Sequence, residues 1–169
     1  MTTPFPSPTT PASSRTEVFV RYLDYFRSRL SEKLESLPPG DLRTSRLPSG
    51  WTPLELLKHL RHVERRWLEW GFAGQPVDDP WADHRDGKWF VEPDETLDSL
   101  LAEFREQAAR SNAIIEAHDL ADVGQPGERW DGAAPANLER VLFHVLQEYA
   151  RHLGHLDIVA ELAAGEAGE

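Results

Sequence analysis

The segment 144–157, HVLQEYARHLGHLD, places three histidines, a glutamate and an aspartate in an otherwise apolar pattern. A helix turns by about 100° per residue, so Glu148 and His152 lie one turn apart on the same face. On this projection His152 falls within the apolar stripe and Glu148 on its border. Burying a carboxylate beside an imidazole costs several kcal/mol unless the pair is hydrogen-bonded, ion-paired or bound to a metal. The pair therefore requires a partner from elsewhere in the chain.

A second segment, WTPLELLKHLRHVERRWLEWGF from residue 51, offers that partner in His59. His59 borders the apolar face of the helix expected there, whereas His62 lies among charged residues. His59, Glu148 and His152 together would supply two nitrogen ligands and one carboxylate oxygen. Such a set suits zinc, nickel or ferrous iron and leaves positions open for water or substrate.

The remaining histidines are interpreted as supporting or surface groups. The ligand hypothesis needs His59, because a glutamate and a histidine four residues apart are also common on solvated helix faces. We place His144 and His155 at the rim of the site, and we expect surface positions for His62, His84 and His118. The chain has no cysteine, so any metal must be held by nitrogen and oxygen atoms, and no cysteine nucleophile is available.

The elements that must position these residues are amphipathic helices. Apolar residues recur at spacings of three and four, which predicts helices over about 16–37, 52–72, 96–118 and 137–164. Thr52, Pro53 and Glu55 form a capping box that starts the second helix, with proline in its favoured first position. No segment alternates as a strand would. The sequence predicts an all-α four-helix bundle with long connecting loops.

The chain is predicted to form one domain over residues 15–165, which is long enough to bury a core of its own. Residues 1–14 contain four prolines and many serines and threonines, so we expect a mobile tail. The segment 73–93 is rich in Pro, Gly and Asp but also contains Trp81, Trp89 and Phe90. A loop of that length is usually functional or covers another part of the domain.

Charge and hydropathy limit the partners. The formal net charge of -11 repels phosphates at long range, so a nucleic-acid partner is not expected. No run approaches the roughly 20 apolar residues of a membrane span, and the N-terminus lacks the features of a signal peptide. We expect a soluble, cytoplasmic protein with small-molecule partners.

Three stretches resemble the DinB-like superfamily of four-helix-bundle metalloproteins: PSGWTPLELLKHLRHVERRW, DPWADHRDGKW and HVLQEYARHLGHLD. The middle stretch resembles the branch related to mycothiol S-transferases. In that family one divalent metal is commonly held by a histidine of the second helix and a pair four residues apart on the last. The resemblance places these ligands at His59, Glu148 and His152. Glutamate departs from the commonest pattern but is similar to the His, Glu, His set of mycothiol-dependent maleylpyruvate isomerases.

The resemblance implies thiol chemistry. Mycothiol or another small thiol would bind the open metal position, lose its proton and attack an electrophile, as in detoxification. Zinc is the first metal expected, with nickel or iron as alternatives, and a homodimer is the expected assembly. His155 or His144 would orient a ligand or move a proton, and Arg151 would take a polar group of the thiol or substrate. An apolar electrophile pocket would be walled by Trp67, Trp70, Trp81 and Trp89.

Two other functions stay open at this point. The same metal site can activate water in a hydrolase that needs no thiol. It can also belong to a non-catalytic metal-binding or stress-related protein, because a fold does not determine a function.

Overall fold

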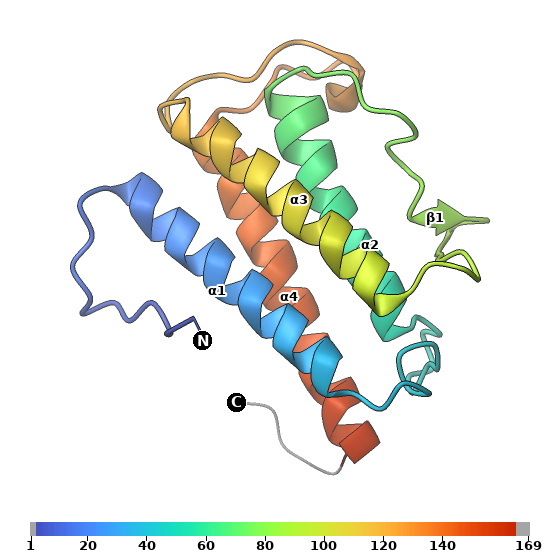
Figure 1. Cartoon of the computed structure of the whole chain (residues 1–169). Helices are drawn as coiled ribbons and strands as arrows, with labels where there is room; N and C mark the ends of the chain where they lie inside the picture. The colour runs from blue at the N-terminus through green and yellow to red at the C-terminus, as the bar shows by residue number, and fades with distance from the viewer. Residues whose placement is uncertain (1–2, 165–169) are drawn as a thin grey trace.

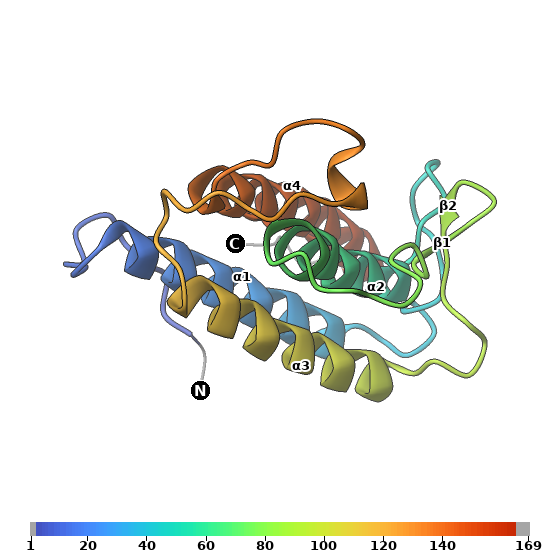
Figure 2. The ribbon, with the colours of Figure 1, turned by 90° about the horizontal axis from the view of Figure 1, so that it is seen from above.

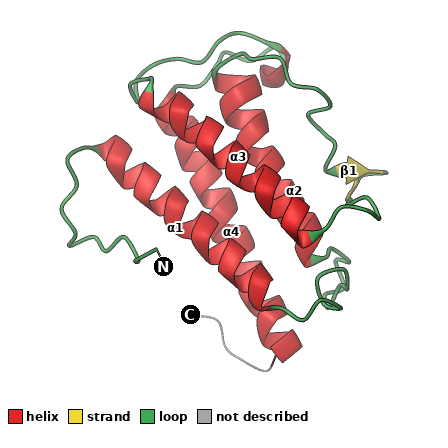
Figure 3. Cartoon of the chain, in the orientation of Figure 1, coloured by secondary structure: helices red, strands yellow, loops and turns green. Residues whose placement is uncertain are grey.

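The structure, a computed structural model, describes residues 3–164 and contains the predicted helices (Figures 1 and 3). They are α1 (Arg15–Ser36), α2 (Pro53–Glu64), α3 (Leu97–Glu116) and α4 (Leu138–Ala164). A π-helical segment, η1 (Arg65–Phe72), continues α2, and a short 3-10 turn, η2 (Glu128–Trp130), precedes α4. Together the helices form a four-helix bundle, which confirms the predicted fold.

The helix order explains the longest connection. Helix α1 packs on α4, and α2 packs on both α3 and α4. Helices α2 and α3 run in the same direction, opposite to α1 and α4 (Figures 1 and 2). Because two neighbouring helices are parallel, the chain must return along the bundle between them, and residues 73–96 make that return over α2.

Side-chain caps begin the helices where the sequence indicates. The Thr52 side chain accepts from the Glu55 backbone N–H, and Glu55 accepts from the Thr52 N–H at 2.7 Å, so the predicted capping box is confirmed. Thr96 and Ser99 form the corresponding box at the start of α3. A fixed first turn sets the direction in which His59, two turns later, points.

The π-helical segment changes the expected register beyond Glu64. The Ala73 N–H donates to the Leu68 carbonyl, five residues back, at 2.9 Å. Its wider turns rotate less per residue, so a regular helical projection does not hold beyond Glu64. Trp67 and Trp70 are half-buried, and the buried positions of η1 are Arg66, Leu68, Glu69, Gly71 and Phe72.

A small hairpin within the return segment was not expected. Strand β1 (His84–Arg85) pairs antiparallel with β2 (Lys88–Trp89), and His84 lies opposite Trp89. Asp86 and Gly87 form the turn with φ values of 53° and 74°, which aspartate and glycine adopt readily. Strands of two residues are too short to alternate detectably, but the Asp-Gly pair was a usable signal. The hairpin lies against α2 (Figure 1).

The return segment also buries a histidine that we expected at the surface. His62 is only 1% exposed, and its Nδ1 donates to the Lys58 carbonyl at 2.9 Å. Its charged neighbours are buried too: Arg66 donates to the Pro80 carbonyl at 3.1 Å. The surface prediction for His62 was wrong because the loop covers this face of the helix. His84 is half-buried, and His118 is exposed as predicted.

Burial of His62 predicts an acid-dependent loss of stability. Burial, opposed by the Lys58 carbonyl, lowers the pKa of His62 to about 4. Between pH 6.5 and 4 the unfolded chain therefore holds a proton that the folded chain does not, so stability falls as pH falls. Denaturant unfolding of metal-free protein should show that His62→Asn removes roughly 3 kcal/mol of the difference between pH 7 and pH 4.

His118→Asn is the matched control for this prediction. His118 makes the same Nδ1 contact with the carbonyl four residues back, at 2.8 Å from Ile114, but is exposed. The control should keep the pH dependence of the unmodified chain. Identical pH dependence in His62→Asn and His118→Asn would contradict a neutral, buried His62.

A buried ion pair joins three helices of the bundle. Arg27 of α1 donates through Nε and Nη2 to the two carboxylate oxygens of Glu64 at 2.8 and 2.7 Å. The Tyr149 hydroxyl of α4 donates to the same carboxylate at 2.5 Å. Glu64 has no exposed surface, and the Arg27 guanidinium beside it is the main influence that lowers its pKa against the opposing effect of burial. The pair fixes α1, α2 and α4 to one another.

The chain before α1 lies along that helix. The Phe5 ring contacts the rings of Tyr22 and Tyr25 edge-on, with centroids 6.1 and 5.3 Å away. The mobility expected for residues 1–14 stays a prediction, and residues 1, 2 and 165 lie outside the described part of the chain.

None of the described helices has the length and apolar character needed to cross a bilayer.

Candidate metal centre

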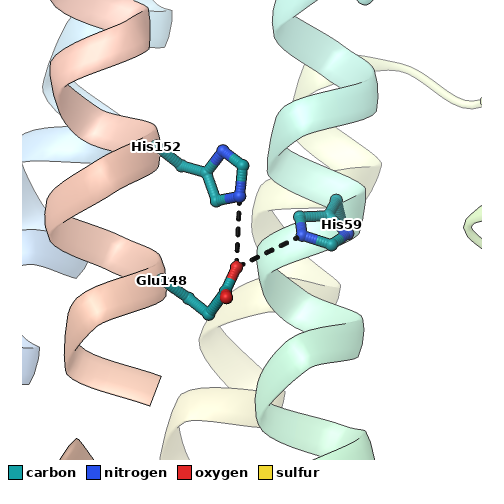
Figure 4. Close-up of side chains that lie close together, drawn as sticks. All are labelled: His59, Glu148 and His152. Atoms are coloured by element: carbon teal, nitrogen blue, oxygen red, sulfur yellow. Dashed lines mark hydrogen bonds and ion pairs between the residues drawn. The ribbon is translucent and has the colours of Figure 1, made fainter. Parts of the chain in front are cut away.

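His59, Glu148 and His152 meet between α2 and α4 (Figure 4). The Glu148 Oε2 atom lies 3.2 Å from Nε2 of His152 and 3.9 Å from Nε2 of His59. One ligand atom from each residue lies within 4.8 Å of the others, which is the spacing of groups that can hold a metal ion. His59 is 9% exposed and His152 is 7% exposed, so the site is shielded but reachable.

Asp83 orients His59 from behind. Its Oδ2 atom accepts from His59 Nδ1 at 3.1 Å, and an ionised carboxylate can only accept, so the proton is on Nδ1. Nε2 then faces Glu148 and, once without a proton, offers its lone pair to a cation. A carboxylate on the far nitrogen of a metal-ligating histidine is the usual way in which the tautomer and ring direction are fixed. The donor set and its orientation therefore fit a divalent cation.

Arg66 holds Asp83 in turn. The guanidinium donates to Oδ1 at 2.6 Å and to Oδ2 at 3.1 Å, and Asp83 has no exposed surface. Although burial raises the pKa of this carboxyl, hydrogen bonds from His59 and Arg66 outweigh it and keep the pKa well below its usual range. His59, Asp83 and His84 also lie close enough to hold an ion. Because a guanidinium already occupies both oxygens of Asp83, we favour the set with Glu148.

Aromatic rings pack against His59 and against the histidines of α4. The Trp89 ring stacks on His59 with centroids 4.2 Å apart and meets His152 edge-on at 5.2 Å. Trp51 lies 6.1 Å from Trp89 and 6.4 Å from His155. Apolar rings at this position exclude water from the imidazoles, which strengthens electrostatic interactions within the site.

The protonation states suit metal binding. The neighbouring His59 is the main influence that lowers the pKa of Glu148 to about 2, against burial and with help from His152 and His144. Burial, together with nearby His59, lowers the pKa of His152 to about 4 although Glu148 opposes this. At neutral pH the site thus offers an ionised carboxylate and a neutral imidazole, the forms that bind metals.

The other predicted site residues are distributed around this centre. His144 Nε2 lies 3.8 Å from Glu148 Oε1, and the His155 ring lies 5.5 Å from the His152 ring. Trp67 contacts the His144 ring at 4.5 Å, so Trp67 and Trp89 lie at opposite sides of the site.

Of the remaining predicted wall residues, Trp70 is half-buried and Trp81 is 48% exposed, with its ring on Arg66. Arg151 is exposed on α4.

Asp83 and Arg66 are the functional residues that sequence reasoning missed. Asp83 lies in the stretch DPWADHRDGKW, which belongs to a long loop. A loop has no periodicity from which its position relative to His59 could be predicted. Arg66 belongs to the charged face around His62, which in a regular helix with nothing covering it would be solvated. The only available signal was the mixture of tryptophans and carboxylates in the loop.

The fold and this site define a class: the protein is a DinB-like four-helix-bundle protein with a candidate site for one metal ion. A family model described as mycothiol-S-transferase matches residues 18–165. The chain therefore belongs to the mycothiol-S-transferase family.

A comparison with solved structures supports the fold. YfiT from Bacillus subtilis, described as "a probable metal-dependent hydrolase with an unusual four-helix bundle topology", is similar with a TM-score of 0.57 and 17% identity. The similarity covers 94% of this chain and 93% of that one. A search of curated proteins found no match.

Proposed function

We propose that the protein is a metal-dependent S-transferase that joins a small thiol, mycothiol, to an electrophile, with His59, Glu148 and His152 as metal ligands. The observation that carries the proposal is the Nε2 atom of His59, which Asp83 turns toward Glu148 and His152 in a chain of the mycothiol-S-transferase family. A bound divalent cation, with zinc expected first, would supply the Lewis acidity that lowers the pKa of a thiol at neutral pH.

The chain's own residues would hold the reactants and move the proton. His144 is the proposed acceptor of the thiol proton. Burial is the main cause that lowers its pKa, so the imidazole is neutral at neutral pH and has a lone pair that can accept a proton. His155, beside His152 and Trp51, is the alternative on the other side of the site. Trp67 and Trp89 would wall the reactants and exclude water. Arg151 is proposed to bind a polar group of the thiol, from the rim.

Calorimetric titration with mycothiol tests this proposal. Zinc-loaded protein should bind the thiol and apoprotein should bind it much more weakly, because binding depends on the cation held by His59, Glu148 and His152. Equal binding by loaded and apoprotein would contradict metal-dependent thiol activation. Loaded protein that does not bind mycothiol would favour a different function.

A hydrolase is the second candidate, because YfiT is described as a probable metal-dependent hydrolase. In that case ester or amide probes would be hydrolysed by the loaded protein without any thiol. Thiol-independent turnover would favour the hydrolase, whereas turnover that requires a thiol would favour the transferase.

Substitution of Asp83 tests the orientation of His59. Asp83→Asn should weaken zinc affinity by about 10- to 100-fold, measured by competition with a chromogenic chelator, because the amide does not fix the imidazole as a carboxylate does. Asp86→Asn is the control in the same loop, since asparagine tolerates its φ of 53°. Equal affinities of the two variants would argue against the positioning role of Asp83.

A further inference from the structure

A cavity adjoins the candidate metal centre on the side of His144. It has a volume of about 480 Å³ and lies between η1, η2 and the first turns of α4. Its lining includes Trp67, Arg129, Trp130, Arg140 and His144. Because His144 Nε2 also lies 3.8 Å from Glu148 Oε1, a molecule in this cavity is one side chain away from a proposed metal ligand.

Arg129 is a cation without a carboxylate partner among the described residues. Its guanidinium lies over the Trp67 ring, 3.7 Å from the ring centroid, and its Nε is buried without a hydrogen-bond partner in the described chain. Among the described residues no carboxylate lies within 4.0 Å of it, although the chain has 29 acidic residues against 18 basic ones. Asp131 lines the same cavity but makes no ion pair with it. Burying such a group has a cost that a bound anion would offset.

Two tryptophan rings give the cavity apolar walls. The Trp67 and Trp130 rings meet at 62° with centroids 6.1 Å apart. The Trp130 Nε1–H already donates to the Gln125 carbonyl at 2.8 Å, so its ring offers mainly apolar surface. Arg140, which is exposed, adds a second positive charge at the rim. A guanidinium binds planar carboxylates through paired hydrogen bonds.

We propose that this cavity binds the carboxylate of an aromatic acid, with Arg129 as the anion ligand and Trp67 and Trp130 as the walls. The binding site stands independently of catalysis; its assignment to the electrophile rests on the proposed transferase function. With a 4-chloro-3-nitrobenzoate electrophile, the thiolate sulfur would form a bond to the ring carbon that carries chlorine. Chloride would leave with its bonding electrons, and the thiol proton would pass to His144 and then to solvent.

Calorimetric titration with 4-chloro-3-nitrobenzoate and its neutral amide, 4-chloro-3-nitrobenzamide, tests the binding site. The zinc-loaded, unmodified protein should bind the acid at least about tenfold more tightly than the amide. Arg129→Gln should remove that preference by weakening acid binding while amide binding is unchanged. Arg105→Gln is the control, because it removes the same charge from an exposed arginine that pairs with Glu35 between α1 and α3.

Two results would overturn the proposal. The first is equal affinity of the unmodified protein for acid and amide, a comparison that does not depend on the folding of any variant. The second is an acid preference that persists in Arg129→Gln. Release of chloride with mycothiol is measured separately: acid binding without chloride release would support the carboxylate site and count against the transferase function for this electrophile.

Discussion

His59→Ala should abolish stoichiometric zinc binding. The substitution removes the only proposed ligand from α2 and leaves Glu148 and His152, two neighbours on one helix. We expect zinc affinity to fall by on the order of 1,000-fold or more, about 4 kcal/mol. Chelator competition gives the affinity, and metal analysis of the purified protein gives the stoichiometry.

His118→Ala is the control, because His118 is exposed just beyond the C-terminus of α3 and lies outside the proposed ligand set. Circular dichroism of the apoproteins separates loss of metal from loss of fold. If His59→Ala does not fold, Glu148→Gln tests the same ligand set from α4. Full zinc content in either folded variant would show that the proposed ligand set is wrong.

Glu64→Gln should destabilise the apoprotein by about 3 kcal/mol, because it removes the carboxylate that two nitrogens of the buried Arg27 contact and leaves the partly exposed Asp24, 2.8 Å from Nη1, as the remaining anionic partner. Arg27 is 5% exposed and makes two hydrogen bonds to Glu64, so solvent cannot compensate it. Denaturant unfolding at neutral pH measures the free energy of unfolding directly.

Glu35→Gln is the matched control, because it breaks an exposed pair with Arg105 and should cost about 0.5 kcal/mol or less. The double variant Arg27→Met with Glu64→Leu should be more stable than Glu64→Gln, since it removes both charges together. A loss below about 1 kcal/mol in Glu64→Gln would mean that the buried pair is not needed for stability.

The sequence predicted the fold because its signals were local and strong. Thr52, Pro53 and Glu55 set the start of α2, and the three-four spacing of apolar residues identified each helix. Those signals also predicted that His59 faces α4, since His59 lies before the π-helical segment and keeps the regular register. The structure brings His59, Glu148 and His152 together as the sequence hypothesis requires, and their role as ligands stays a proposal.

Prediction failed where tertiary contacts changed the environment of a helix. A projection cannot show that residues 73–96 cover the face of His62 and Arg66. It also assumes a constant rotation per residue, which the π turns after Glu64 do not keep. Asp83 is positioned by a loop, so no periodicity could relate it to His59.

The proposed function combines family membership with a site that is partly preorganised. Asp83 and Arg66 orient His59, and Trp89 shields it. The cavity beside His144 then offers space next to the proposed ligands, together with the Arg129 cation, which has no carboxylate partner in the described part of the chain. These features place a thiol and an acidic electrophile at neighbouring positions in the proposed reaction.

The most direct test of the account is the absorption spectrum of cobalt-substituted protein during titration with mycothiol. If the thiol sulfur joins an ion held by His59, Glu148 and His152, an intense sulfur-to-cobalt charge-transfer band should grow to one equivalent. It should be absent in His59→Ala and preserved in His118→Ala. A cobalt spectrum that mycothiol leaves unchanged would contradict metal-dependent thiol activation at this site.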